Sequence, residues 1–253
     1  MTEPIAPSST GPLQKWMLRA RCGSKAEVRA AILAGRVAID GVVTTRFAHP
    51  VAPGVSVTLD GTPVSPPPAE RLVWVMNKPK KHLTRIDDTP ERLGLGRYIP
   101  ADLPRLFPVG RLDYNSEGVL LWTDDGHLAR RILHPDWHLP KVYAVKIRGH
   151  IEPDDPRLDR MRRGMDIGEG LVTRPATVTL GERRTRATWV HITITEGKNR
   201  QIRRMCHALH YQIVKLRRTA VGPVSLGDLN PRCARALTDD EQAALRAAVG
   251  LTP

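Results

Sequence analysis

One carboxylate, Asp113, is placed by its neighbours as a candidate reactive group. It lies in the run Gly110–Gly126, between Arg111 and a turn-forming Asn115-Ser116 pair, just ahead of an apolar stretch typical of a strand. Asn and Ser side chains hydrogen-bond to nearby backbone, and Gly takes positive φ without strain, so such a loop holds one shape. A loop of this kind, backed by a buried strand, presents a single reactive group. An Asp that only caps the turn is the alternative, and it is the commoner role for an Asp taken alone.

A second candidate group lies far along the chain, at the start of a predicted helix. The segment Gln201–Leu209 carries an apolar stripe at helical spacing. Arg203 and Arg204 fall in its first turns, where the helix dipole is already positive, so they require an anionic partner. Phosphate and carboxylate both meet that requirement.

The charge balance predicts a polyanionic partner. Lys and Arg number 39 against 26 Asp and Glu, which gives a net charge of +13. Basic side chains that neutralise phosphates release condensed counterions, so an excess of this size favours nucleic acid. Aromatic residues make up only 4%, which argues against a broad aromatic stacking platform.

Membrane, metal and disulfide chemistry find no support in the sequence. No apolar run approaches the ~20 residues of a membrane span, and no amphipathic helix shows a clear lipid-facing side. Without a secretory signal, the expected location is cytoplasmic. Cys22, Cys206 and Cys233 are far apart and the nine histidines are scattered. We therefore expect neither a metal site nor a disulfide framework.

A Pro-rich stretch over residues 61–70 is predicted to be an extended linker. We expect a disordered N-terminus over 1–11, a small unit over 12–60 and a larger unit over 71–250. A chain of 253 residues with 41% hydrophobic content is long enough for both units to bury a core.

The small unit is predicted to contain two short helices and a hairpin. Ser24 and Glu27 form a capping box at the second helix, and Asp40-Gly41 is a hairpin turn. This pattern resembles the small RNA-binding domain named after ribosomal protein S4. The resemblance implies an RNA-docking module that raises affinity through effective concentration; a merely solvated basic surface is the alternative. Its candidate RNA-binding residues are Lys15, Arg19, Arg21, Lys25, Arg29 and Arg36.

The larger unit carries several motifs in a fixed order. They are Asn77-Lys78-Pro79, the Gly110–Gly126 run, Lys141 with Tyr143, Gln201-Ile202-Arg203 and Val214–Pro223. In this order they resemble the motifs of the RsuA-type ribosomal RNA pseudouridine synthases. The resemblance implies the α+β pseudouridine synthase fold, a mixed, largely antiparallel central sheet with flanking helices.

The resemblance also implies a role for each matching residue. Asp113 is the catalytic nucleophile and Arg203 its ionic partner, while Tyr143 flanks the target base and is placed to accept a proton. Leu216 packs under the base. Apart from the resemblance, we hypothesise that Arg111 fills the space that a flipped uridine leaves, because it lies next to Asp113. The other candidate substrate-binding residues are Asn77, Lys78, Lys141, Arg200 and Arg204.

Two points stay open at the level of the motifs. The family usually has a Gly following the Pro of its first motif, whereas this chain has Lys80-Lys81-His82, which leaves the shape of that loop undetermined. Lys215, Arg217 and Arg218 suit phosphate contacts and exposed strand charges equally well.

The implied reaction is the isomerisation of uridine to pseudouridine. The base detaches at nitrogen 1, turns and reattaches through carbon 5, so neither a redox cofactor nor a metal is expected. Whether Asp113 adds to the ribose or assists a glycal intermediate stays open. The expected partner is ribosomal RNA or a pre-ribosomal particle, bound by a monomer.

Other functions remain possible on the same residues. The Thr188–Gly197 lead into the third motif favours large-subunit ribosomal RNA, with small-subunit ribosomal RNA as the alternative target. A non-catalytic rRNA-binding or ribosome-assembly protein on the same scaffold is a second class. A DNA-binding protein that uses the N-terminal helices is a third, but it leaves the Asp113 run without a role.

Overall fold

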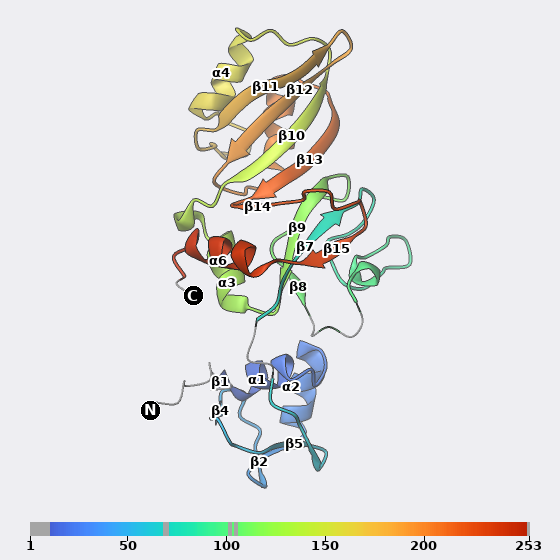
Figure 1. Ribbon diagram of the computed structural model, residues 1–253, viewed down its shortest axis with the longest axis vertical. Coiled ribbons are helices and arrows are strands. Elements are labelled where there is room, and N and C mark those ends of the chain that lie inside the picture. The colour runs from blue at the N-terminus through green and yellow to red at the C-terminus, as the bar shows by residue number, and fades with distance from the viewer. Residues whose placement is uncertain (1–10, 68–70, 101–102, 104–105, 252–253) are drawn as a thin grey trace. The chain divides into compact units, whose positions relative to one another are not determined.

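The computed structural model describes residues 11–67, 71–100, 103 and 106–251 (Figure 1). The predicted disordered N-terminus therefore lies outside the described residues, apart from Gly11. Contacts divide the chain into two compact units, Met1–Leu72 with Ala101–Leu106, and Val73–Pro100 with Phe107–Pro253. We call these the N-terminal unit and the main unit, and describe each by itself.

The N-terminal unit packs two helices against a small sheet. The helices are α1 (Leu13–Arg19) and α2 (Lys25–Leu33). The strands β2 (Val37–Ile39), β3 (Val42–Val43), β5 (Val57–Leu59) and β6 (Thr62–Pro63) form a sheet in the order β3-β2-β5-β6, and β1 (Gly11–Pro12) pairs with β4 (Pro50–Val51). Leu13, Met17 and Ile32 are fully buried and join the strands in one core.

Local sequence signals explain how these elements begin and turn. The Ser24 capping box is confirmed, because the Glu27 amide donates to Ser24 Oγ over 3.2 Å and the Glu27 carboxylate accepts from the Ser24 amide. Asp40 and Gly41 both have positive φ, which a tight hairpin turn requires. Thr62–Pro63, assigned above to the linker, instead form the edge strand β6, where a Pro removes no hydrogen bond that the sheet needs.

The main unit is built on a nine-stranded sheet with the order β11-β12-β10-β13-β9-β7-β15, to which β8 and β14 add at β9 and β13 (Figure 1). Its strands are β7 (Val73–Lys78), β8 (Phe107–Pro108), β9 (Glu117–Thr123), β10 (Lys141–Arg148), β11 (Thr177–Arg184), β12 (Ala187–Ile194), β13 (Ile213–Val221), β14 (Val224–Ser225) and β15 (Ala234–Ala236). Its helices are α3 (Gly126–Leu133), α4 (Pro156–Arg163), α5 (Gln201–Ala208) and α6 (Asp239–Ala247), with short 3-10 turns at Gly96–Tyr98 and Pro135–Trp137. The pairings within this sheet are antiparallel except for β13 with β9, which confirms the predicted mixed, largely antiparallel α+β class.

Each half of this sheet has its own hydrophobic core. Residues of β10, β12 and β13 pack with α4 and α5, including the predicted stripe of α5, whose Met205 and Cys206 are completely buried. Residues of β7 and β9 pack with α3 and α6, which lie together beside that half in Figure 1. The apolar run of β9 from Val119 to Trp122 is buried on both faces of the sheet, as expected of a strand that other parts of the chain cover on each side.

Gly118 makes the junction between the two halves possible. The parallel contact of β9 with β13 consists of Glu117 beside Arg217 and Gly118 beside Arg218. Gly118 has a φ of 111°, and a Cβ atom added to it would lie 2.0 Å from the Arg218 carbonyl oxygen. Only glycine tolerates both that backbone conformation and that approach. The junction therefore depends on one residue without a side chain.

We expect Gly118→Ala to destabilise the main unit by about 2–4 kcal/mol, because it adds backbone strain and a steric clash at the junction. Urea denaturation followed by tryptophan fluorescence measures the effect. Gly126→Ala is the matched control, since a Cβ atom at Gly126 meets nothing within 4 Å. Equal denaturation midpoints for the two variants would contradict this account of the junction.

Candidate active site

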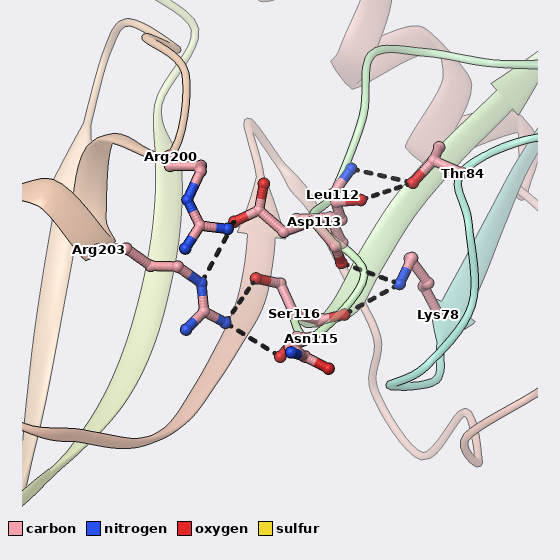
Figure 2. Close-up of polar contacts among 8 residues, drawn as sticks. All are labelled: Lys78, Thr84, Leu112, Asp113, Asn115, Ser116, Arg200 and Arg203. Carbon is pink, nitrogen blue, oxygen red and sulfur yellow. Dashed lines mark hydrogen bonds and ion pairs between the residues drawn. The ribbon is translucent and has the colours of Figure 1, made fainter. Parts of the chain in front are cut away.

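Asp113 lies in the loop between β8 and β9, with its side chain 28% exposed. The backbone around it is fixed by several hydrogen bonds (Figure 2). Thr84 Oγ1 donates to the Leu112 carbonyl over 2.7 Å and accepts from the Leu112 amide over 3.2 Å. The Ser116 amide donates to the Asp113 carbonyl over 3.0 Å and closes the turn. The loop thus presents an accessible carboxylate in a defined position.

Arg203 holds both the carboxylate and the loop that carries it. Its Nε donates to Asp113 Oδ2 over 3.2 Å, while its Nη2 donates to the Asn115 carbonyl over 3.0 Å and to Ser116 Oγ over 3.1 Å (Figure 2). The planar guanidinium makes these contacts simultaneously, which a lysine cannot do. Arg203, in the first turn of α5, therefore meets a loop far away in the sequence, and the anionic partner that it requires is a carboxylate.

A second guanidinium approaches the same carboxylate. Arg200 Nη1 lies 3.9 Å from Asp113 Oδ2, and more than half of the Arg200 side chain is exposed. Two cations thus face one anion, so this side of the loop keeps positive charge available for a phosphate group.

Lys78 supports the loop from the side opposite Arg203 (Figure 2). It is completely buried, and its Nζ donates to the carbonyl oxygens of Pro79, Asp113 and Ser116 over 3.0, 3.2 and 3.0 Å. Burial lowers the pKa of Lys78 to about 8, while the negative charges of Asp113 and Glu117 act in the opposite direction. A buried ammonium satisfied by three carbonyls shapes the backbone and has no surface to offer to RNA.

The structure corrects the prediction that Asn77 and Lys78 contact substrate. Asn77 is also buried, and its Nδ2 donates to the Leu229 carbonyl over 2.7 Å. Both side chains hold other parts of the main unit, because β7 ends behind the Asp113 loop. Asn77 and Lys78 therefore support the backbone of the main unit around the Asp113 loop.

Tyr143 and Leu216 provide an apolar wall on the face of the sheet that α5 covers. Leu216 is 4% exposed and lies directly across from Val145 on β10. Tyr143, two residues before Val145, is partly buried and packs against the same core. The side chains predicted to flank and underlie a base therefore share one face, and Arg203 reaches Asp113 from the helix over that face.

The other residues of the main unit that we predicted to bind substrate have different surroundings. Arg204, predicted to bind substrate, forms an ion pair of 2.7 Å with the exposed Glu169. Lys141 is partly buried, and burial together with the charge of Arg218 lowers its pKa to about 8. Arg111 is exposed beside Asp113 and has no ion pair within the described residues.

The basic residues of the N-terminal unit are mostly at its surface. Those exposed are Lys15, Arg21, Lys25, Arg29 and Arg36, while Arg19 is partly buried. Arg36 Nε donates to Asp60 over 2.7 Å and the Arg29 guanidinium lies 4.6 Å from the Phe47 ring centre. These two cations therefore already have partners within the unit.

The loop that departs from the family pattern has a defined shape. Lys81 adopts a φ of 60°, a left-handed conformation that glycine takes without strain, and its amide donates to the Tyr114 carbonyl over 2.7 Å. His82 is buried, with Nε2 2.9 Å from the Tyr98 hydroxyl. The chain thus keeps the turn without a glycine there. Thr84, which follows this loop, was missed by sequence reasoning because one Thr in a loop carries no periodic signal.

Two further features of the described residues concern metal binding and membrane insertion. No group of three or more His, Cys, Asp or Glu residues among them could hold a metal ion. None of their helices has the length and apolar character that crossing a membrane requires.

Comparisons with known proteins agree with this geometry. A family model described as RNA pseudouridylate synthase matches residues 72–208, and an S4 domain model matches residues 11–65. The chain therefore belongs to the RNA pseudouridylate synthase family, whose members are isomerases, and carries an S4 domain.

Individual relatives match nearly the whole chain. It is 36% identical to an RNA pseudouridine synthase of Aquifex aeolicus (strain VF5) over 94% of this chain and 95% of that protein. It is 31% identical to ribosomal large subunit pseudouridine synthase B of Bacillus subtilis (strain 168), with 93% and 95% covered. The protein of the same name from Salmonella typhi is 36% identical, with 87% and 76% covered. A crystal structure of a pseudouridylate synthase, 24% identical, superposes with a TM-score of 0.65 over 92% of this chain and 99% of that one, which supports the fold.

We expect Lys78→Met to lower the rate of pseudouridine formation by about ten- to a hundredfold, because small displacements of a reacting group are costly. Methionine matches the length of lysine but donates nothing to the three carbonyls. The affinity for RNA should stay nearly unchanged, since Lys78 is buried. Single-turnover rates and RNA dissociation constants separate the two quantities, and a loss confined to affinity would contradict a supporting role.

We expect Arg203→Lys to reduce single-turnover pseudouridine formation by about a hundredfold or more, as removal of a preorganised donor does in other active sites. The substitution keeps the positive charge but cannot contact Asp113, Asn115 and Ser116 together. Arg160→Lys on α4 is the matched control and should retain the wild-type rate. Retained activity in the Arg203 variant would show that charge alone suffices.

Proposed function

We propose that this protein isomerises a specific uridine of ribosomal RNA to pseudouridine, with Asp113 as the nucleophile. The observation that carries this proposal is the Asp113 carboxylate, accessible at 28% and held by Arg203 on a loop with fixed backbone. A structural Asp that caps a turn would not need a guanidinium from a distant helix. Tyr143 and Leu216 lie on the sheet face that α5 covers, and the partly exposed Tyr143 is the side chain against which a base would rest.

The proposed reaction begins with cleavage of the bond between ribose carbon 1′ and uracil nitrogen 1. Asp113 either adds to carbon 1′ or assists formation of a glycal, in which case Tyr143 accepts the ribose proton. The detached uracil turns, and carbon 5 forms the new bond to carbon 1′. Carbon 5 loses a proton and nitrogen 1 gains one, so the atoms balance without a cofactor. Arg203 stabilises the carboxylate charge of Asp113 before the bond to uracil breaks and again whenever Asp113 is released as a free carboxylate.

The uridine must leave its stack before it reaches Asp113. Extrusion of a base costs a few kcal/mol, and phosphate contacts offset that cost. Arg111, exposed next to Asp113, is placed to enter the vacated space, and Arg200 is placed to meet a phosphate. The S4 domain adds affinity for the same RNA molecule through its exposed basic residues.

The favoured target is large-subunit ribosomal RNA. The names of the Bacillus subtilis and Salmonella typhi relatives support this choice. A uridine in small-subunit ribosomal RNA is the second candidate, and a non-catalytic role in ribosome assembly is the third. We expect the protein to act as a cytoplasmic monomer that needs no metal.

Asp113→Asn should abolish pseudouridine at one position of ribosomal RNA, because the amide is neither an anion nor an effective nucleophile. The measurement is pseudouridine mapping of ribosomal RNA from cells whose own copy is replaced by the variant. Asp154→Asn, an exposed carboxylate far from the loop in sequence, is the matched control and should leave the map intact.

Each outcome of this mapping has a definite meaning. A single lost site in large-subunit RNA supports the whole proposal, and a lost site in small-subunit RNA supports the reaction but changes the target. An unchanged map would reject the assignment of Asp113 as the nucleophile in ribosomal RNA.

A further inference from the structure

A groove of about 380 Å³ lies on the main unit beside the Asp113 loop. The buried Lys78, which supports the loop from the side opposite Arg203, forms part of its wall. The other charged residues that line the groove are Lys80, Glu117, Lys215, Arg217 and Arg232. Pro79 and Pro231 form rigid parts of the wall. Grooves of this size accommodate groups as large as a nucleotide.

The groove lies on the opposite face of the sheet from the base-binding wall. Successive side chains of a strand point to opposite faces. On β13, Leu216 points into the core that α5 covers, so Lys215 and Arg217 on either side of it point to the other face. The groove is therefore separate from the surface formed by Tyr143 and Leu216.

Most of the positive charge in the groove is not neutralised. Glu117 Oε1 lies 2.8 Å from Lys215 Nζ and neutralises the charge of that lysine. Lys80, Arg217 and Arg232 have no ion pair within the described part of the chain. Three cations thus remain around a concave surface, which is a favourable environment for anions.

The positive surface continues across the sheet onto β10 and β12. Lys146 on β10 lies directly opposite Lys215 on β13. Like charges in such cross-strand positions destabilise a sheet. The pairing of Lys146 with Lys215 therefore does not contribute to the stability of the sheet. Trp189 lies opposite Lys146 on β12, with the Lys146 ammonium 5.9 Å from its ring centre. Trp189 is partly exposed, and the basic surface therefore ends at an aromatic ring.

We propose that this surface, the back-face groove formed by Lys80, Lys215, Arg217, Arg232, Lys146 and Trp189, binds a second segment of the RNA whose uridine reaches Asp113. Backbone phosphates meet the unpaired cations, and one base stacks on Trp189. The choice of RNA rests on the proposed function and on the net charge of +13. The RNA then contacts both faces of the sheet, on either side of the Asp113 loop.

The test is a binding measurement with the full chain carrying Asp113→Asn, so that catalysis does not enter. The probe is a fluorescently labelled RNA hairpin with single-stranded flanks, titrated at several salt concentrations. Arg217→Gln with Arg232→Gln should raise the dissociation constant about tenfold and lower the salt slope by about two, one per lost phosphate contact. The matched control, Arg160→Gln with Arg163→Gln on α4, removes the same charge and should change neither quantity comparably.

Trp189→Leu adds an independent readout. Loss of stacking should weaken binding by about five- to a hundredfold, while the salt slope stays unchanged. Leucine keeps an apolar side chain on the strand, and thermal unfolding verifies that each variant is folded.

Two results would contradict the proposal that the back-face groove binds RNA. One is a groove variant with the same affinity and salt slope as the α4 control. The other is a polyglutamate probe that binds as tightly as RNA and loses affinity equally in the variant, since the ligand would then be an acidic protein. The proposed reaction and the proposed RNA-binding groove can fail separately. If the wild-type chain makes no pseudouridine but the groove variants still lose RNA affinity, the proposed reaction is rejected and the RNA-binding role of the groove is supported.

Discussion

The ion pair between Asp113 and Arg203 is the interaction on which the arrangement of the main unit depends. A carboxylate that must react cannot be deeply buried, and one that is merely exposed has no fixed position. The guanidinium of Arg203 resolves this conflict, because it contacts the carboxylate and the backbone and side chain next to it. For that contact, α5 must lie over one half of the sheet while the loop extends from the other half. The close approach of β9 and β13 at Gly118 brings the two halves together.

Charge is distributed around this pair in a way that suits a polyanion. Arg200 and Arg111 lie on the exposed side of the loop, and Lys78 lies on its buried side. Lys78 shows that a cation near a catalytic loop need not meet the ligand, since its three partners are carbonyl oxygens of the chain itself. Arg204 makes the same point at the surface, where Glu169 occupies it. A basic residue near a motif can therefore already have a partner within the chain.

Much of the fold follows from sequence patterns, and the exceptions have physical reasons. The stripe of α5, the Ser24 capping box and the strand at Lys141–Arg148 were predictable because each depends on periodicity or on a short local signal. The order of motifs predicted that Asp113 and Arg203 would meet. Asn77 and Lys78 were placed at the substrate because a motif gives spacing along the chain but not which side of a loop a strand passes. Thr62–Pro63 were assigned to a linker because proline content alone does not reveal an edge strand.

The supports of the Asp113 loop have a consequence for how such an enzyme diversifies. The Lys78 ammonium donates to three main-chain carbonyls, and the Thr84 hydroxyl bonds to the main-chain carbonyl and amide of Leu112. Every amino acid supplies these carbonyls, and all but proline supply the amide, so these hydrogen bonds do not depend on which side chains the loop displays. The exposed positions 111 and 115 can therefore change with the RNA while the nucleophile stays in place. Catalytic geometry and target recognition are thus separable traits, and one can drift or be engineered without loss of the other.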